Sequence, residues 1–222
     1  MFSEQFNQLI DACTIGDLKT VKALIPTMDV TLLQSAALRT AACYNHTPIV
    51  LELLPHSDST AVENDALRHA IEHNNCVLID ALLPLCDPYA KNHRVSVFAW
   101  SAYLSRTDVV MKIERLHASS PHDCEGAIEF CVYQKFVPNN TILAHLLSKC
   151  RLQNLSEIFD ICLNEGHESW IDRLRPLLPD KEIDLACYYA KHNHYPKAEQ
   201  YGTRLTQTPS QSNTTNTCWP IV

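Results

Sequence analysis

Two histidines and a glutamate lie within one five-residue stretch, His69-Ala70-Ile71-Glu72-His73. On a helix, residues four apart share one face, so the two imidazoles could bind one zinc ion while Glu72 polarises a water molecule on it. That chemistry would be zinc-dependent hydrolysis. A pattern with only three fixed positions has a high false-positive rate, so the surrounding elements must decide between a metal site and an ordinary helix.

Cysteine is the other residue type here with obvious reactivity. The chain has ten cysteines, and no two of them form a C-x-x-C pair. Without that spacing and without a secretory signal, we expect reduced and mostly buried thiols and no structural zinc site. No cysteine carries the signature of a known catalytic pair, and no G-x-S-x-G serine motif occurs. Several cysteines stand among small or apolar residues, as core-filling side chains would: Cys13, Cys43, Cys131, Cys162 and Cys187.

The elements that must position these residues belong to an internal repeat. Three segments align without a gap: LIDACTIGDLKTVKALIP from Leu9, LRTAACYNHTPIVLELLP from Leu38 and LRHAIEHNNCVLIDALLP from Leu67. The step between them is 29 residues, and a small residue in the first half, an apolar pair and a closing proline all keep it. Chance does not readily keep so many positions in phase, so the segments are copies of one unit.

Each copy predicts a helix, a break and a second helix. Apolar residues three or four apart define one face of the first helix. Gly16, Asn45 and Asn74 share the phase of the break, and these residue types tolerate the left-handed conformation that ends a helix. Ser35 and Asn64 precede their first helices as expected N-caps. The closing proline ends the second helix.

The repeat resembles the ankyrin repeat. ACTIGDLKTVKALI, residues 12 to 25, is similar to the family's pattern of a small-residue helix, a glycine and a helix ending in Val-x-x-Leu-Leu. AALRTA and DALRHA look like degenerate forms of T-P-L-H-x-A, with Arg39 and Arg68 where histidine usually stands. No copy begins with Thr-Pro, the hairpin glycine is missing and the step is shorter than the usual ~33 residues, so we expect reduced or absent β-hairpin fingers.

Further copies follow with insertions. Residues 98 to 116 repeat the third copy after 31 residues, 125 to 147 form a fifth pair, and 162 to 176 repeat the first copy with Gly166 at the phase of Gly16. A seventh pair over 185 to 205 can also be interpreted as a tetratricopeptide-like pair. The expected fold is therefore all-α, an ankyrin-like solenoid of about six to seven degenerate helical pairs.

Three regions are expected along the chain. Regular ankyrin-like repeats occupy 1–116, degenerate helical repeats continue the stack over 117–205, and 206–222 is a flexible polar tail because it carries no charge and is rich in Thr, Ser, Asn and Gln. A second interpretation makes the repeats from about Cys124 onward a separate helical domain.

Composition excludes several classes of function. Hydrophobic residues make up 46% and charged residues 19%, which fits a folded chain, and the four glycines disfavour nucleotide-binding loops. The formal charge of −7 with no run of basic residues argues against a nucleic-acid partner. No signal peptide or stretch of about 18 apolar residues is seen, so no membrane insertion is expected.

Within the repeat, His69 takes the phase of Thr40 and His73 that of Tyr44, positions at which the copies differ freely. The ankyrin resemblance implies that such positions, on the concave side formed by the first helices and loops, contact a partner. Trp100 or Tyr44 could instead pack between neighbouring repeats. The expected partner contacts are Arg39, Thr40, Tyr44, Arg68, His69, Glu72, His73, Trp100 and Tyr103.

The expected function is therefore non-catalytic binding of a protein partner, with no cofactor, metal or small-molecule substrate. Degenerate repeats of irregular step resemble those of bacterial effectors and viral host-interaction proteins, which implies a cytoplasmic protein or one secreted into a host cell without a Sec signal peptide. The alternative is a zinc-dependent hydrolase built on the helix of His69 and His73.

Overall fold

The computed structural model describes residues 4–90, 95–181 and 183. Every regular element in these ranges is a helix and none is a strand, which confirms the all-α prediction. The chain divides into two compact units, Met1–Cys150 and Arg151–Val222. None of the helices in the described ranges combines the length and the apolar character needed to cross a bilayer.

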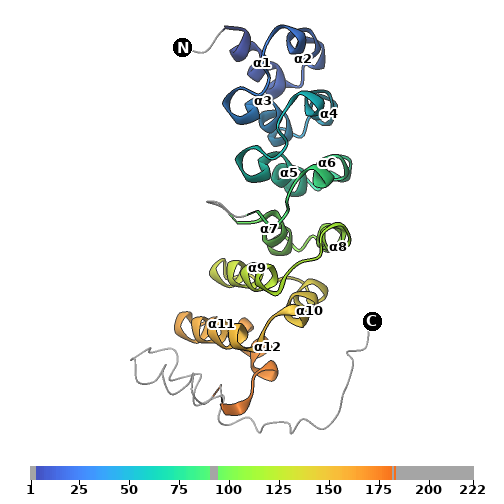
Figure 1. Ribbon diagram of the computed structural model, residues 1–222. Coiled ribbons are helices and arrows are strands. Elements are labelled where there is room, and N and C mark those ends of the chain that lie inside the picture. Colours follow the sequence, from blue (N-terminus) through green and yellow to red (C-terminus); the bar gives the residue numbers. More distant parts are fainter. Residues whose placement is uncertain (1–3, 91–94, 182, 184–222) are drawn as a thin grey trace. The chain divides into compact units, whose positions relative to one another are not determined.

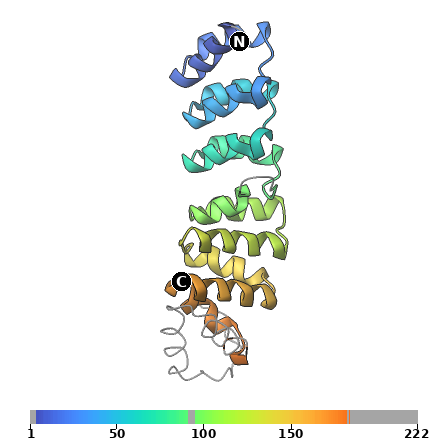
Figure 2. The same ribbon diagram turned by 90° about the vertical axis from the view of Figure 1, so that its left-hand side faces the viewer.

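The first unit consists of five successive helical pairs (Figure 1). The first helices contact one another in chain order, and so do the second helices of the first three pairs and of the last two. Figure 2 shows the first helices stacked one after another in chain order. The pairs are α1 (Glu4–Ile15) with α2 (Leu18–Leu24), α3 (Leu32–Cys43) with α4 (Thr47–Leu53), α5 (Ala61–Glu72) with α6 (Cys76–Leu82), α7 (Val97–Tyr103) with α8 (Thr107–Leu116), and α9 (Pro121–Tyr133) with α10 (Asn140–Lys149).

The core of this unit follows the repeat phases. Leu9, Leu38 and Leu67, which stand at one phase of the first helices, are all 0% exposed, and Phe98 occupies the same phase in α7 and is equally buried. An apolar side chain of this size gains about 1.5–3 kcal/mol when it leaves water. The spacing that identified the repeat is thus the spacing of the residues that hold neighbouring pairs together.

The break between the two helices of a pair is made by one left-handed residue. Gly16 (φ +83°), Asn45 (φ +59°) and Asn74 (φ +54°) have this conformation, as their residue types predict. Ser105 and Lys135 have it in the next two pairs, although neither residue type announces it.

The loops between pairs contain short 3₁₀ helices in place of β-hairpin fingers, which the sequence predicts to be reduced or absent. The second helices of the first three pairs continue into short 3₁₀ helices, η1 (Ile25–Thr27), η2 (Leu54–His56) and η3 (Leu83–Leu85), each with proline in its first turn. An aspartate follows each of them and accepts a hydrogen bond from the backbone N–H two residues on: Asp29, Asp58 and Asp87. No strand occurs in these described loops.

Three left-handed residues form the start of both α3 and α5, directly after Leu32 and Ala61, and their side-chain contacts contradict the expected N-caps. Ser35 and Asn64 are the last residues of these turns. Ser35 Oγ accepts from Asp58 N at 2.8 Å, and Asn64 Nδ2 donates to Asp87 O at 2.9 Å. Both side chains therefore hold the loop of the following repeat, and the prediction that they cap their own helices is wrong.

The second unit contains a sixth pair, α11 (Leu152–Glu165) and α12 (Glu168–Leu174), followed by η4 (Arg175–Leu177). Gly166 separates the helices with φ +71°, which confirms that it corresponds to Gly16. Phe159 and Trp170 are buried in this pair. The seventh pair expected over 185–205, with Cys187, and the tail over 206–222 lie outside the described residues, and the unit division after Cys150 does not test the boundary placed after residue 116.

The described cysteines are free thiols of mixed exposure. Cys13, Cys131 and Cys162 are 0% exposed in first helices, which confirms them as core residues. Cys43 is exposed, so its assignment to the core is wrong. It ends α3 at the phase of Glu72, which is also exposed, on the solvent side of the helix.

Candidate functional site

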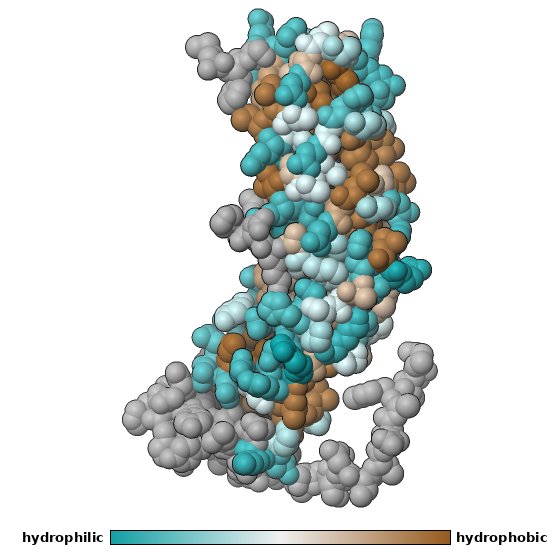
Figure 3. All heavy atoms as spheres, in the orientation of Figure 1, coloured by the Kyte–Doolittle hydropathy of each residue, from teal (hydrophilic) through white to brown (hydrophobic). Residues whose placement is uncertain are grey.

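The five first helices of the first unit form one surface, which we call the first-helix face: the solvent-exposed and half-buried side chains of α1, α3, α5, α7 and α9. These helices contain eight acidic residues and two arginines, whereas α2, α4, α6, α8 and α10 contain four acidic and five basic residues. Brown, apolar residues gather along the upper right-hand edge of Figure 3, the side of the second helices. Among the second helices, Leu51 of α4 and Val77 of α6 are exposed. The two sides of the unit therefore differ in charge.

The two histidines of the five-residue motif have separate protein partners. His69 Nδ1 donates to Glu72 Oε2 at 2.9 Å, and its Nε2 lies 3.7 Å from Asp65 Oδ2. His73 Nε2 donates to the carbonyl of Cys43 in the preceding repeat at 2.7 Å. Among residues 4–90, 95–181 and 183, no group of three His, Cys, Asp or Glu side chains is arranged to hold a metal ion.

Arg39 belongs to the same polar chain as His69. Its Nη1 pairs with Asp65 Oδ2 at 3.3 Å, so that Arg39, Asp65, His69 and Glu72 connect α3 to α5. Arg39 also donates to two backbone carbonyls of the left-handed turn at the start of its own helix. The structure thus brings three of the predicted contacts together, through one acidic residue that the sequence did not single out.

Arg68, Trp100 and Tyr103 form a second group. Arg68 is only 8% exposed, donates to Val95 O at 2.6 Å and places its guanidinium 4.9 Å from the centre of the Trp100 ring. Both aromatic rings contact Phe130 of α9, at centroid distances of 6.1 and 5.5 Å. These contacts connect α5, α7 and α9. The Trp100 and Tyr103 rings are half-buried and therefore remain part of the first-helix face.

Tyr44 and Thr40 remain on the surface near the other end of the face. Tyr44 is 54% exposed and stacks beside His46, with ring centroids 6.4 Å apart. Thr40 lines a shallow groove between α1 and α3. Of the nine predicted contacts, Tyr44, Glu72 and His73 are exposed, Arg68 is buried and the others are half-buried.

A row of residues at the starts of the second helices, the cap row, connects the breaks of successive pairs: His46, Asn75, Arg106 and Asn139. His46 Nε2 donates to Thr14 O at 3.0 Å, and Asn75 Nδ2 donates to Asn45 Oδ1 and Thr47 Oγ1. Arg106 and Asn139 make the corresponding contacts farther along. The cap row therefore fixes each turn against the preceding one.

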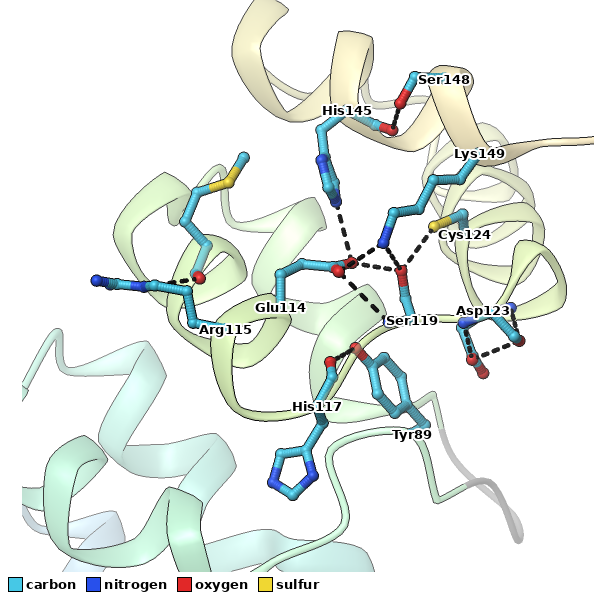
Figure 4. Close-up of polar contacts among 12 residues, drawn as sticks. Tyr89, Glu114, Arg115, His117, Ser119, Asp123, Cys124, His145, Ser148 and Lys149 are labelled. Carbon is cyan, nitrogen blue, oxygen red and sulfur yellow. Dashed lines mark hydrogen bonds and ion pairs between the residues drawn. The ribbon is translucent and has the colours of Figure 1, made fainter.

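A polar cluster that the sequence did not reveal joins α8, the start of α9 and α10 (Figure 4). Glu114 is bonded by Ser119 and by Lys149 Nζ at 2.6 Å, and His145 Nε2 lies 3.0 Å from its second oxygen. Lys149 also donates to Ser119 Oγ at 2.9 Å, and Cys124 Sγ lies 3.2 Å from that oxygen. The partners are up to 35 residues apart in the chain, so no local pattern signals them.

The electrostatics of this cluster favour structure over catalysis. Burial by itself would raise the pKa of Glu114, but the hydrogen bonds from His145, Lys149 and Ser119 outweigh it and lower the pKa to about 2. Lys149 Nζ donates to both Glu114 Oε2 and Ser119 Oγ, so the amine connects two residues of the cluster. Burial also raises the pKa of the Cys124 thiol, which disfavours the reactive thiolate.

Comparison of the chain with protein-family models, curated proteins and solved structures gave no match.

Proposed function

We propose that this chain is a non-catalytic protein-binding module, an ankyrin-like solenoid that contacts a partner through its first-helix face. The observation that carries the proposal is the contrast between conserved phases and variable ones within the repeat. Leu38 and Leu67 stand at equivalent positions of two repeats and are identical and buried. At two surface positions the same repeats differ, since Thr40 corresponds to His69 and Tyr44 corresponds to His73. A constant scaffold with a variable surface is how repeat proteins achieve specificity.

The rigidity of that surface supports the same proposal. Arg39 connects two repeats by an ion pair, the Trp100 ring connects three, and the cap row fixes the turns. A preorganised surface loses little conformational entropy when it binds, so it favours occlusion or scaffolding of a partner. Exposed Tyr44 and Tyr133 supply aromatic contact area of the kind found at interface hot spots.

The test uses two triple variants of the full chain. Tyr44→Ser, Glu72→Lys and Tyr133→Ser alter the first-helix face, and Leu51→Ser, Val77→Ser and Asp108→Lys alter exposed positions of the second helices as a matched control. Proteins captured by the wild-type chain are quantified by mass spectrometry. Loss of about 2 kcal/mol at a hot spot corresponds to roughly 30-fold lower recovery with the first variant.

Equal recovery with both triple variants would remove the first-helix face from consideration. The hydrolase alternative is judged on the same purified protein by its zinc content, with His69→Ala and His73→Ala as comparisons. We expect no stoichiometric zinc, because His69 and His73 each bind a different protein group. One zinc per chain that both substitutions abolish would overturn the non-catalytic proposal.

A further inference from the structure

A groove lies between α1 and α3 on the first-helix face. Its volume is about 560 Å³, and its apolar lining comes from Phe6, Ile10, Leu33 and Ala36. Asn7, Asp11 and Thr40 add polar groups. The groove is shallow and open, whereas small-molecule sites bury most of their ligand. Its dimensions therefore fit a side chain presented by another chain better than a free ligand.

Leu33 forms one wall of the groove in a conformation that costs free energy. It is the first of the three left-handed residues at the start of α3, with φ +50° and ψ +46°, a region that residues other than glycine and asparagine rarely adopt. Nevertheless its side chain remains 48% exposed. Val62, the equivalent residue in the next repeat, has the same backbone conformation but is half-buried. Burial of the Leu33 side chain within its own repeat therefore does not explain why Leu33 adopts the left-handed conformation.

Arg39 holds this wall in place. Its Nη2 donates to Leu33 O at 3.2 Å and its Nε donates to Gln34 O at 3.0 Å. The ion pair to Asp65 fixes the same guanidinium to α5. The apolar wall is thus formed before any partner arrives, which lowers the entropy cost of binding.

The charges around the groove indicate what flanks the apolar anchor. Glu4 and Asp11 of α1 are exposed, and α1 carries no basic residue. Arg39 is the basic residue of α3, and its guanidinium is already paired with Asp65. Together α1 and α3 carry two acidic residues and one arginine, a net formal charge of −1, and Asp65 of α5 pairs with that arginine. A basic segment is therefore electrostatically complementary to this end of the face.

We propose that the groove between α1 and α3 binds an apolar side chain of an extended, arginine- or lysine-rich segment of the partner protein. The proposal rests on the proposed function, since it specifies the chemistry of the partner at one end of the first-helix face. Ile10, Leu33 and Ala36 contact the apolar side chain, and Asp11 attracts the basic residues beside it. Arg39 is a positioning residue, because it supports Leu33 through the backbone.

The experiment measures fluorescence anisotropy of three labelled heptapeptides with the full chain. They are Gly-Arg-Arg-Leu-Arg-Arg-Gly, the same peptide with serine for leucine, and the same peptide with glutamate for every arginine. We expect the first to bind at least about 10-fold tighter than the glutamate peptide, because of the charge, and about 5-fold tighter than the serine peptide, because of the buried leucine.

Groove variants and matched controls locate the site. Leu33→Ser should weaken binding of the leucine peptide by about 5-fold and remove its advantage over the serine peptide, and Asp11→Asn should weaken binding of both basic peptides by about 3-fold. Leu85→Ser and Asp108→Asn, also at exposed positions but away from the groove, should stay within about 2-fold of wild type. Circular dichroism verifies that each variant is folded.

Two results overturn the proposal: no preference for the leucine peptide, or equal losses in the groove variants and their controls. The fate of the proposed function is decided separately. If Leu33→Ser and Asp11→Asn retain a captured partner that the Tyr44, Glu72 and Tyr133 triple variant loses, the function stands and the groove assignment fails. If the triple variant retains it as well, the function itself fails.

Discussion

At the scale of single residues, the first unit depends on polar groups whose partners lie one repeat away. Glu114 is the clearest case, because it bonds Lys149, Ser119 and His145 with only 10% of its side chain exposed. Breaking one side of such a buried ion pair leaves the other charge without compensation. The surface pair of Lys22 and Glu52, 3.2 Å apart and more than a third exposed on both sides, provides a natural comparison.

Glu114→Gln should therefore lower the free energy of unfolding by about 2–4 kcal/mol, and Glu52→Gln by at most about 0.5 kcal/mol. The measurement is urea denaturation followed by circular dichroism. Similar small effects of the two substitutions would show that the Glu114 cluster does not stabilise the fold.

The same variant has a signature in pH. The pKa of Glu114 is lowered from 4.5 to about 2, so its stabilising contribution is complete above about pH 4.5 and is lost as the pH falls toward 2. We expect the stability difference between wild type and Glu114→Gln to shrink from about pH 5 to pH 3. A difference that stays constant over that interval would contradict the assignment.

The sequence predicted the buried apolar residues of the repeat but not the hydrogen bonds between repeats, and this difference has a physical reason. The buried phase of Leu9, Leu38 and Leu67 follows from helical spacing, which a chain shows locally. The bond from Asn64 to Asp87, 23 residues away, and the bonds of Glu114 depend on how repeats stack. Arg39 and Arg68 were predicted as partner contacts by phase, but their guanidiniums already bind neighbouring protein groups.

At the scale of elements, the left-handed break decides how closely two repeats approach. A Cβ atom built on Gly16 would lie 2.8 Å from His46 Cε1, closer than carbon atoms approach without a shift. His46 is also the residue that donates to Thr14 O. Gly16 is thus required both by its φ of +83° and by the ring of the next repeat.

Gly16→Ala should destabilise the chain by about 1–3 kcal/mol, from left-handed strain and displacement of His46. Gly126→Ala, inside α9 and therefore in ordinary helical backbone, should instead stabilise by up to about 1 kcal/mol. Thermal unfolding of the two variants shows whether each substitution lowers or raises the stability of the chain. If Gly16→Ala stabilised the chain, the His46 ring would be able to move away from the added Cβ atom at little energetic cost.

Loops between helices were the hardest elements to predict. Proline after each second helix indicated a stop, and it lies in a 3₁₀ helix as that residue allows. The left-handed turns at the start of α3 and α5 could not be foreseen, because Leu33, Gln34, Val62 and Glu63 are residue types that disfavour this conformation. Contacts to the following loop hold them there, and Ser35 and Asn64 make those contacts.

At the scale of the whole molecule, the chain divides into two compact units after Cys150, so we expect proteolysis to separate the chain there first. The segment around Ser119 and Ser120 lies just before Cys124, where the second sequence-based interpretation begins a separate helical domain. Ser119 is bonded to Glu114 and Lys149, and Ser120 forms a capping box with Asp123, so this segment is tied to the helices on both sides.

Limited trypsin digestion should therefore cut after the exposed Arg151 before it cuts after Arg115. Mass spectrometry of the early fragments identifies the sites. In Glu114→Gln, which loosens the cluster, cutting after Arg115 should become faster by several-fold. Early cleavage at Arg115 in the wild-type chain would favour a boundary near Ser119 instead.

The uneven charge of the first unit has a practical consequence for handling the protein. Eight acidic residues and two arginines on one set of helices, against four acidic and five basic residues on the other, give the unit a dipole moment directed across its helical pairs. A positively charged resin or sensor chip would adsorb the chain through its acidic side at low ionic strength, where charges act over tens of ångströms. The orientation imposed by such a support would hide the first-helix face from every molecule in solution.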